Sequence, residues 1–314
     1  MEGFPMVAIQ PYFVFATYQY YKKPVMRHGI AHIYHYHRNC HEFDMISAIP
    51  DACVDIFFEK KNSGVKARAC GTVLEITGLA EHREKEYFGI RFMPGVLPAN
   101  IRAEMKDLVC HELELADVMK NKDIAKRIAD AEDWQQGIRL FVEDYLASLR
   151  NASCYSAGDQ RRLADHIRNV ILCTAGTVRI SELAEQTGYT ARYINHLFNR
   201  YFGLSPKTFE EIIRFQNAIQ LINHHQEEQL TNIALETGYF DQAHFIREFK
   251  KYLTITPAEY RTLVRQHAYL QRLNVQTSRR RALRMHRYVN GGFVAYRPHI
   301  RGPEYGRRML QEEQ

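Results

Sequence analysis

The sequence predicts an α+β protein of two domains, in which a β-rich N-terminal domain ending in helices precedes an all-α domain. Three observations predict it. Short stretches rich in β-branched and aromatic residues, separated by turn residues, fill residues 6–93. From about Arg102 the apolar residues follow helical spacing instead. Within the C-terminal half, one pattern of helix and turn residues occurs twice.

The composition is that of an ordinary globular protein. The chain has 314 residues, of which 46% are hydrophobic and 25% charged, enough for two domains. No apolar run approaches the roughly 18 residues of a membrane span, and Met1 to Tyr21 lack the pattern of a signal peptide. The six cysteines are scattered, which is typical of free thiols in a reducing compartment. We therefore expect a cytoplasmic protein without membrane association.

The N-terminal domain is expected to span residues 1–150. Strands are predicted at Ile30–Tyr36, Cys53–Phe58 and Tyr87–Met93, with turns at sites such as Pro94-Gly95 between them. A helix closes the domain, because its apolar residues share one face. These residues are Ile138, Phe141, Val142, Tyr145 and Leu149. A polar stretch at 151–159 is the predicted linker.

The net charge of +6 is unevenly divided along the chain. Residues 1–150 hold 19 basic and 21 acidic residues (19 − 21 = −2), whereas residues 151–314 hold 23 and 15 (23 − 15 = +8). A basic half suggests a polyanionic partner. However, nine of those basic residues lie in the last 37 positions, within a predicted basic tail at 274–314. Charge alone therefore does not establish DNA binding, whereas the motifs of the C-terminal half are more specific.

The C-terminal domain, expected at 160–273, contains an internal duplication. Four residues recur at a shift of fifty: Ala184, Thr187, Gly188 and Tyr189 as Ala234, Thr237, Gly238 and Tyr239. Three more recur at a shift of fifty-one: Phe198, Tyr201 and Pro206 as Phe249, Tyr252 and Pro257. One residue is therefore inserted just after the second Gly-Tyr pair. Two copies indicate a paired module rather than a solenoid.

Each copy meets the steric requirements of a helix-turn-helix. A small residue, Ala184 or Ala234, stands where the second helix crosses the first. Four residues later a glycine allows the sharp turn, and the second helix starts at an N-cap residue, Thr190 or Asp241. The expected units span about 180–202 and 230–253.

A linker helix at 206–224 is predicted between the two units. Ser205 is its expected N-cap and Pro206 its first residue. At about 1.5 Å per residue such a helix is about 28 Å long. Successive major grooves on one face of B-DNA recur about every 34 Å. One chain could therefore place two recognition helices in adjacent major-groove segments.

The second copy carries a family resemblance. The stretch Gly238–Phe245, continuing through Phe249-Lys250-Lys251 to Thr256-Pro257, closely resembles the signature of the AraC/XylS regulators, and the similarity covers residues 178–261. The resemblance implies a DNA-binding regulator of transcription, often an activator that contacts RNA polymerase. It also implies an N-terminal domain for sensing or dimerisation, commonly a small cupin-like or related barrel.

The residues expected to contact DNA lie on the polar faces of the two second helices. The N-terminal turns of such helices contact bases, and Arg, Asn and Gln match base edges. The expected base contacts are Arg192, Asn195 and His196 in the first unit, and Gln242, His244 and Arg247 in the second. Tyr193 shares the first polar face, where His196 replaces the stronger base contact usual in the family. Arg200, Lys250 and Lys251 lie further along and are expected at phosphates.

The N-terminal domain carries a histidine-rich segment. Gly29, His35, His37 and Glu42 match the spacing of the first cupin metal motif, and residues two apart share a strand face. The expected second motif is missing around residues 89–100, and aromatic-flanked histidines on strands are more often packed or surface residues. We therefore predict no metal or cofactor, with His35, His37 and Glu42 as the alternative ligands. A small-molecule site formed by His35, His37 and Arg91 on one strand face is a further expectation.

The sequence therefore favours a non-enzymatic, sequence-specific transcription regulator. Its expected partners are double-stranded DNA, RNA polymerase, a small-molecule effector and a second copy of the chain. Two alternatives remain open. One is a cupin-like metal-dependent enzyme fused to a DNA-binding domain. The other is a constitutive DNA-binding protein whose N-terminal domain serves only protein–protein contact.

Overall fold

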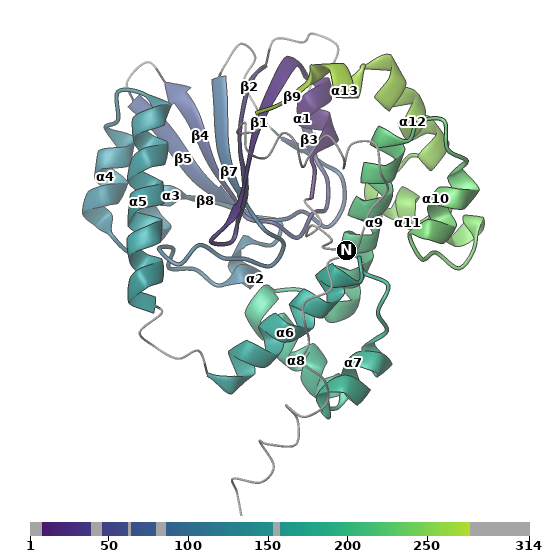
Figure 1. Ribbon diagram of the computed structural model, residues 1–314. Coiled ribbons are helices and arrows are strands. Elements are labelled where there is room, and N and C mark those ends of the chain that lie inside the picture. Colours follow the sequence, from purple (N-terminus) through teal and green to yellow (C-terminus); the bar gives the residue numbers. More distant parts are fainter. Residues whose placement is uncertain (1–7, 39–45, 62–63, 80–85, 153–157, 277–314) are drawn as a thin grey trace, which may run out of the picture.

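The architecture is known from a computed structural model, shown in Figure 1, which describes residues 8–38, 46–61, 64–79, 86–152 and 158–276. Within these residues most of the strands lie in the N-terminal half, and the C-terminal half is almost entirely helical. The expected β-rich domain followed by helices and an all-α part is confirmed. The more specific expectation, that the N-terminal domain is a cupin-like or related barrel, remains a prediction.

The described strands form a seven-stranded sheet and a separate two-stranded one. The order in the large sheet is β8-β5-β4-β7-β2-β1-β9, and β3 pairs with β6. The strands are β1 (Thr17–Arg27), β2 (Ile30–Arg38), β3 (Ile46–Ala48), β4 (Asp55–Lys61), β5 (Gly64–Cys70), β6 (Thr77–Leu79), β7 (Glu86–Phe92), β8 (Glu112–Glu114) and β9 (Leu273–Val275). Neighbouring strands are antiparallel, except that β9 runs parallel to β1.

Helices occupy both sides of the large sheet (Figure 1). Those of the N-terminal half are α1 (Pro11–Phe15), α2 (Met105–Leu108), α3 (Leu115–Val118), α4 (Lys122–Ala129) and α5 (Trp134–Ala152). Those that follow are α6 (Asp159–Cys173), α7 (Ile180–Thr187), α8 (Ala191–Phe202), α9 (Pro206–His224), α10 (Leu230–Glu236), α11 (Gln242–Leu253), α12 (Pro257–Gln266) and α13 (Tyr269–Arg272). Helix α1 lies in the region expected to be mainly β, and Pro11 presets its first turn.

Helices α3–α5 cover one face of the sheet and form an aromatic core with it. Phe92 of β7 packs edge-on against Tyr145 of α5, with ring centroids 5.2 Å apart. The rings of Phe58 of β4 and Phe141 of α5 also pack edge-on, with centroids 6.4 Å apart. All four rings are buried, so this face is closed by the helix whose apolar spacing is visible in the sequence.

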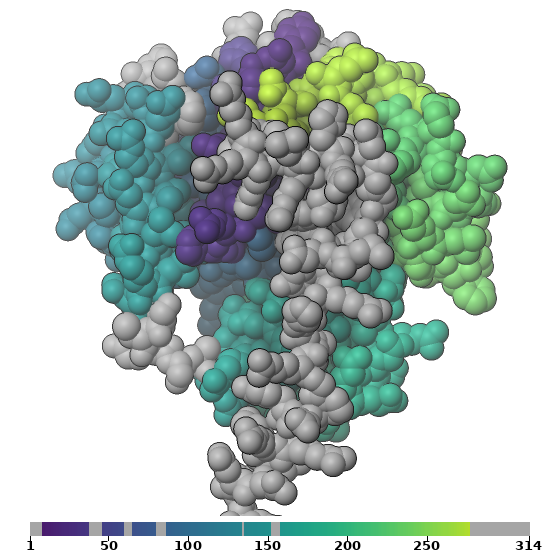
Figure 2. Space-filling view, in the orientation of Figure 1, coloured from purple at the N-terminus to yellow at the C-terminus, as the bar shows by residue number. Residues whose placement is uncertain are grey.

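The opposite face of the sheet shares its core with the C-terminal helices. Tyr20, Tyr34 and Tyr36 of the sheet belong to the same buried cluster as Phe215 of α9 and Tyr260 of α12. In Figure 2 the C-terminal helices, coloured yellow, lie directly against the N-terminal residues, coloured purple. Strand β9 completes this contact, so the predicted boundary at residue 274 falls inside a strand of the N-terminal sheet.

Two further properties follow from the described residues. None of their helices has both the length and the apolar character needed to cross a bilayer. Four of the cysteines fall within the described ranges, where they are not joined in disulfides: Cys53, Cys70, Cys110 and Cys173. Cys40 and Cys154 lie outside them.

Candidate nucleic-acid interface

The first helix-turn-helix unit consists of α7 and α8. Gly188 ends α7 with a φ of 73°, a left-handed conformation that favours glycine. Thr190 caps α8, because its side chain accepts a hydrogen bond from the Tyr193 amide. Ile194 and Phe198 are fully buried and hold α8 against the rest of the unit. The turn and the cap predicted from the sequence are therefore present.

The second unit, α10 and α11, repeats this geometry. Gly238 has a φ of 80°, and Asp241 caps α11 by accepting a hydrogen bond of 2.6 Å from the His244 amide. Phe245 and Phe249 are fully buried beneath α11. Ala234, which is 1% exposed, lies where the two helices of the unit pack. The second unit thus folds for the same local reasons as the first.

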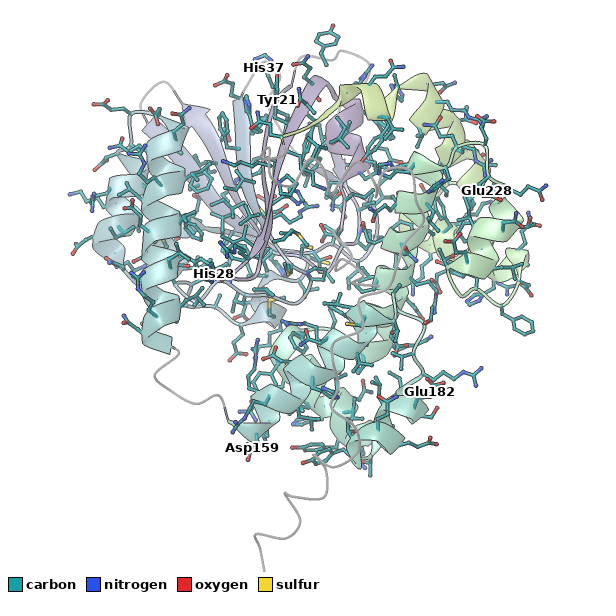
Figure 3. The ribbon with its side chains drawn as sticks, in the orientation of Figure 1. Tyr21, His28, His37, Asp159, Glu182 and Glu228 are labelled. Atoms are coloured by element: carbon teal, nitrogen blue, oxygen red, sulfur yellow. The ribbon has the colours of Figure 1, made fainter. Side chains whose placement is uncertain are left out.

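Helix α9 joins the two units and has the bounds expected of the linker helix. Ser205 caps it by accepting a hydrogen bond of 3.0 Å from the Thr208 amide, and Pro206 occupies its first turn. Most of its side chains are buried. Figure 3 labels Glu182 on α7 and Glu228 just before α10, which mark the two units on either side of α9. A buried helix is a rigid spacer, so the distance between the units is set by its length of about 28 Å.

Most side chains expected to contact DNA are in solvent. The exposed ones are Arg192, Asn195, His196, Arg200, Gln242, Arg247, Lys250 and Lys251. Tyr193 and His244 are half-buried. The helical periodicity therefore separates the residues that face the core from those that face solvent, as predicted. Exposure alone does not show which of these residues meets a base.

Three of these residues already have partners within the chain. Arg200 donates to Gln160 Oε1 at 3.3 Å, and Lys251 forms an ion pair of 2.7 Å with Glu211. His244 Nε2 lies 3.5 Å from Glu248. These contacts compete with DNA for the same side chains. Arg192, Asn195, His196, Gln242, Arg247 and Lys250 are therefore the freer candidates among the described residues.

A buried ion pair fixes α11 against α9. The Arg214 guanidinium donates to both carboxylate oxygens of Glu248, at 3.3 and 2.9 Å, and its side chain is only 8% exposed. Arg214 also donates to the Gly176 carbonyl at 3.2 Å and lies 5.1 Å from the centre of the Tyr239 ring. The partners are 34 residues apart, so no local pattern in the sequence shows this pair. Its bidentate geometry orients the second recognition helix.

A second buried carboxylate, that of Glu210 on α9, makes the stability of the fold depend on pH. Burial raises the pKa of Glu210 from 4.5 to about 7, and Lys207 and Arg214 offset only part of that rise. The folded state therefore holds a proton that the unfolded state releases, so stability falls as the pH rises from about 4.5 to about 7. We predict that Glu210→Gln removes this fall, which is on the order of 2 kcal/mol. Urea unfolding at pH 5 and pH 8 tests it, and an equal fall in both proteins would contradict it.

The structure separates two groups of residues that were expected on one strand face. Successive side chains of a strand alternate between faces, and Arg91 pairs in register with His32, not with His35 or His37. Arg91 therefore points to the face toward α9, whereas His35 points to the other and stacks on Phe88 at 4.2 Å. Figure 3 shows His37 beside Tyr21 at one end of the sheet. The predicted joint site of His35, His37 and Arg91 is wrong.

The described residues do not form the metal site that the sequence left open as an alternative. Among them, no group of three His, Cys, Asp or Glu side chains is placed to hold a metal ion. Glu42 lies outside the described residues. Burial lowers the pKa of His35, and its ring is already stacked between Phe88 and Tyr21. A packed histidine accounts for this arrangement.

Arg91 instead lies at a cavity inside the N-terminal half. The cavity has a volume of about 270 Å³. Its lining includes Arg91, Asp51, Asp55, Tyr34, Phe57 and Thr72. Arg91 Nε donates to Asp55 at 2.9 Å, and its Nη1 lies 3.3 Å from Asp51. The Tyr34 hydroxyl donates to Asp55 at 3.3 Å. The single positive charge of Arg91 is therefore shared by two carboxylates.

The cavity wall is hydrogen-bonded to the linker helix. Gln216 of α9 donates to the Pro50 carbonyl at 2.7 Å and accepts a hydrogen bond of 2.8 Å from the Ile9 amide. The next residue, Asp51, pairs with Arg91 and accepts a hydrogen bond from Gln10. A short chain of buried polar contacts thus leads from the cavity to α9. The sequence gives no sign of it, because Gln216 and Pro50 are 166 residues apart.

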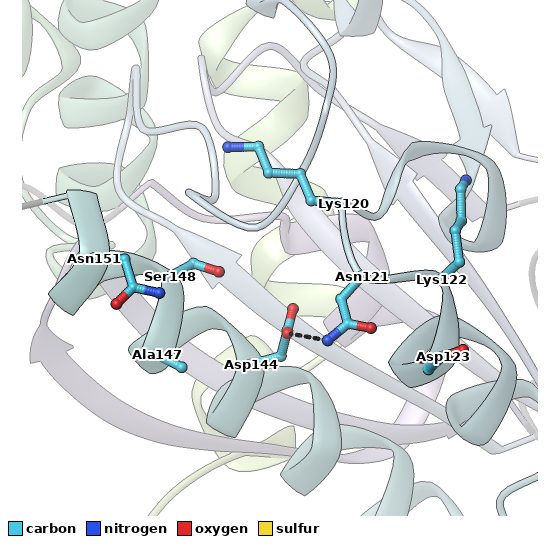
Figure 4. Close-up of a pocket in the computed structure, with 8 residues that line it drawn as sticks. All are labelled: Lys120, Asn121, Lys122, Asp123, Asp144, Ala147, Ser148 and Asn151. Carbon is cyan, nitrogen blue, oxygen red and sulfur yellow. Dashed lines mark hydrogen bonds between the residues drawn. The ribbon is translucent and has the colours of Figure 1, made fainter.

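A second hollow, shown in Figure 4, is open to solvent at the start of α4. Its two lysines are occupied: Lys120 donates to the Ala99 carbonyl and Lys122 to the carbonyls of Ala116 and Asp117. Asn121 is bonded to Asp144. The Asn121 contact joins the start of α4 to α5, and both lysine ammonium groups are taken up by backbone carbonyls rather than left to bind a ligand.

Comparison with known sequences places residues 183–263 in a helix-turn-helix domain family. An uncharacterized HTH-type transcriptional regulator of Haemophilus influenzae is 27% identical over 171 residues, which are 54% of this chain and 57% of that protein. The lactose operon transcription activator of Staphylococcus xylosus is 30% identical over 84 residues, 27% of this chain and 30% of that protein. The chain thus spans little more than half of the first relative and less than a third of the second.

Solved structures give matches of lower sequence identity. The C-terminal domain of AraT, a response regulator from Geobacillus stearothermophilus, is 24% identical, covers 34% of this chain and 85% of that one, and has a TM-score of 0.29. ToxT from Vibrio cholerae is 11% identical, covers 74% and 97% of the two chains, and has a TM-score of 0.40. Residues 183–263, which match the helix-turn-helix domain family, contain the turns of both units and the whole of α9. The C-terminal part of this chain carries an AraC-type helix-turn-helix domain.

Proposed function

We propose that the protein is a sequence-specific DNA-binding regulator of transcription. The observation that carries this proposal is the pair of capped, solvent-facing helices α8 and α11, which are joined by the buried helix α9, about 28 Å long. Each helix presents its N-terminal polar face to solvent. Relatives described as transcriptional regulators support the same function. Double-stranded DNA is therefore the proposed partner, and an enzymatic role is not proposed.

The proposed roles of the exposed side chains follow their position on the helices. Near the N-terminal turns, Arg192, Asn195, His196, Gln242, His244 and Arg247 contact base edges. Further along, Arg200, Lys250 and Lys251 contact phosphates, which fix register without specifying sequence. Tyr193 stacks on Tyr189 with ring centroids 5.1 Å apart, so it supports the first interface from the side.

A single substitution on α11 distinguishes base contact from phosphate contact. We expect Arg247→Ala to weaken binding to the selected DNA site by about 1–3 kcal/mol, with little change on random DNA, because Arg matches the acceptors of guanine. Lys250→Ala is the matched control on the same helix, expected to weaken both about equally. Fluorescence anisotropy at fixed salt measures both. An equal loss on both DNAs for Arg247→Ala would show that Arg247 contacts only phosphate.

We further propose that the cavity beside Arg91 binds the effector. Its volume of about 270 Å³ is at the lower end of ligand pockets, which suits a small molecule. The aromatic rings of Tyr34 and Phe57 offer apolar contact, and the Arg91 guanidinium is already paired with two carboxylates, so it offers no free positive charge to an anionic ligand. A thermal-shift screen of small molecules, run on the wild-type protein and on the Ala48→Leu variant, tests this proposal. The larger side chain of the variant narrows the cavity. A compound that stabilises both proteins equally would place the effector elsewhere.

Contact with RNA polymerase and formation of a homodimer remain proposals. One chain already contains both recognition helices, so DNA binding does not require a second copy. Sedimentation at several protein concentrations, with and without DNA, distinguishes a monomer that binds one site from a dimer that binds two.

A further inference from the structure

The insertion in the second unit leaves a large apolar side chain in solvent beside α11. Phe240 is 88% exposed, the highest value among the large hydrophobic side chains of the described residues. The preceding Tyr239 is only 3% exposed, and its ring lies against Arg214. The second unit thus buries the tyrosine that follows its turn glycine, whereas the corresponding Tyr189 of the first unit is 47% exposed, and it exposes the inserted phenylalanine.

The first unit shows what the insertion changes. There Tyr189 directly precedes the N-cap Thr190, and its ring stacks on Tyr193 of the same unit. In the second unit Phe240 separates Tyr239 from the N-cap Asp241. The ring of Phe240 therefore stands at the entrance to α11, the place that Tyr189 occupies before α8, but it is far more exposed (88% against 47%).

The position of Phe240 places it close to the residues proposed to contact bases. It immediately precedes Asp241, whose carboxylate is occupied by the His244 amide, and Gln242 begins α11. In helix-turn-helix domains the N-terminal end of the recognition helix enters the major groove. A side chain at this end therefore meets base edges or the walls of the groove.

The apolar character of the phenyl ring limits which bases it can recognise. The ring of phenylalanine has no hydrogen-bonding atom, so it cannot use the donors and acceptors of the groove. The apolar feature of the major groove is the C5-methyl group of thymine, which Phe is suited to contact. Covering that methyl group removes apolar surface of both partners from water.

We propose that Phe240 is a specificity-determining residue that contacts a thymine methyl group in the second major-groove segment. This inference rests on the proposed function, because it requires α11 to enter a major groove. Its distinctive consequence is a preference for thymine over uracil at one position, since the two bases differ only in that methyl group.

The test uses the full-length protein and a duplex carrying the DNA site selected by it. Each thymine of the second conserved block is replaced in turn by deoxyuridine, and the Kd is measured by fluorescence anisotropy at fixed salt. At one position we expect wild-type binding to weaken about fourfold, the value of one buried methyl group. Phe240→Ala is expected to bind the thymine and deoxyuridine sites equally. Leu235→Ala, which removes another exposed apolar side chain (65%) of the same unit, should keep the wild-type preference.

The possible results separate this inference from the proposed function. Wild-type protein that binds the site but tolerates deoxyuridine at every position would overturn the role of Phe240 alone. The same holds if Phe240→Ala keeps the thymine preference, and a loss of transcription activation in that case would assign Phe240 to a protein partner. Failure of the wild-type protein to bind any DNA would overturn the proposed function and this inference together.

Discussion

Replacing Arg214 by alanine is expected to lower the free energy of unfolding by about 3–5 kcal/mol, because Glu248 would remain buried without its partner. Both side chains are less than a tenth exposed, and the guanidinium donates to both carboxylate oxygens. Urea unfolding measures the loss. DNA binding by the second unit should weaken with it, since the same pair orients α11 against α9.

The first unit suggests which substitution can restore the stability lost in Arg214→Ala. At a shift of fifty-one residues, the position of Glu248 corresponds to Leu197, which is 1% exposed and packs in the core. An apolar residue at this place is therefore compatible with the fold. We expect the double variant Arg214→Met/Glu248→Leu to recover most of the stability.

An exposed ion pair of the same two helices provides the control. Lys251→Ala removes the pair with Glu211, which solvent screens, and should cost about 1 kcal/mol or less. If Arg214→Ala and the double variant proved equally destabilised, the cost would come from lost packing rather than from an uncompensated buried charge.

Replacing Gln216 by leucine is expected to lower the free energy of unfolding by about 2–6 kcal/mol. The substitution leaves the Ile9 amide and the Pro50 carbonyl buried without partners, and each such group costs about 1–3 kcal/mol. Hydrogen exchange at the Ile9 amide should accelerate, because that amide loses its acceptor. The contact between α9 and the wall of the cavity would be lost at the same time.

Gln220 offers a matched control one helical turn further along α9. Its Oε1 atom is buried but has no hydrogen-bond partner among the described residues. Gln220→Leu therefore removes no bonded acceptor and should be nearly neutral. Equal effects of the two substitutions would contradict the role assigned to the Gln216 hydrogen bonds.

The sequence predicts the second half of the chain well because its signals are local. Caps and turns depend on neighbouring residues, and Ser205, Thr190 and Asp241 cap the helices expected of them. The positive φ of Gly188 and Gly238 follows from the sharp turn that each unit requires. The repeat then supplies a second, independent copy of each signal.

The features that the sequence did not predict depend on long-range pairing. Arg214 and Glu248 are 34 residues apart, and Gln216 and Pro50 are 166 apart. The strand pairing of β1 with β9 joins the two ends of the described chain. Hydrophobic periodicity shows which side of an element is buried, but not which other element covers it.

The N-terminal site illustrates the same limit. Spacing correctly indicates that His35 and His37 share a strand face, but the register that relates them to Arg91 lies in another strand. Because a shift of one residue exchanges the two faces, Arg91 could be placed only once the pairing was known. The cavity formed around Arg91 is likewise a product of tertiary packing.

Selection of bound sequences from random DNA, by the full-length protein at near-physiological salt, is the decisive test of whether one chain binds two adjacent major-groove segments. The geometry of α8, α9 and α11 predicts two short conserved blocks whose centres lie about one helical turn, roughly 34 Å, apart. Such a result would also supply the site for the Arg247 and Phe240 measurements. A single conserved block, or no enrichment even at low salt, would contradict the proposal that one chain binds two adjacent major-groove segments.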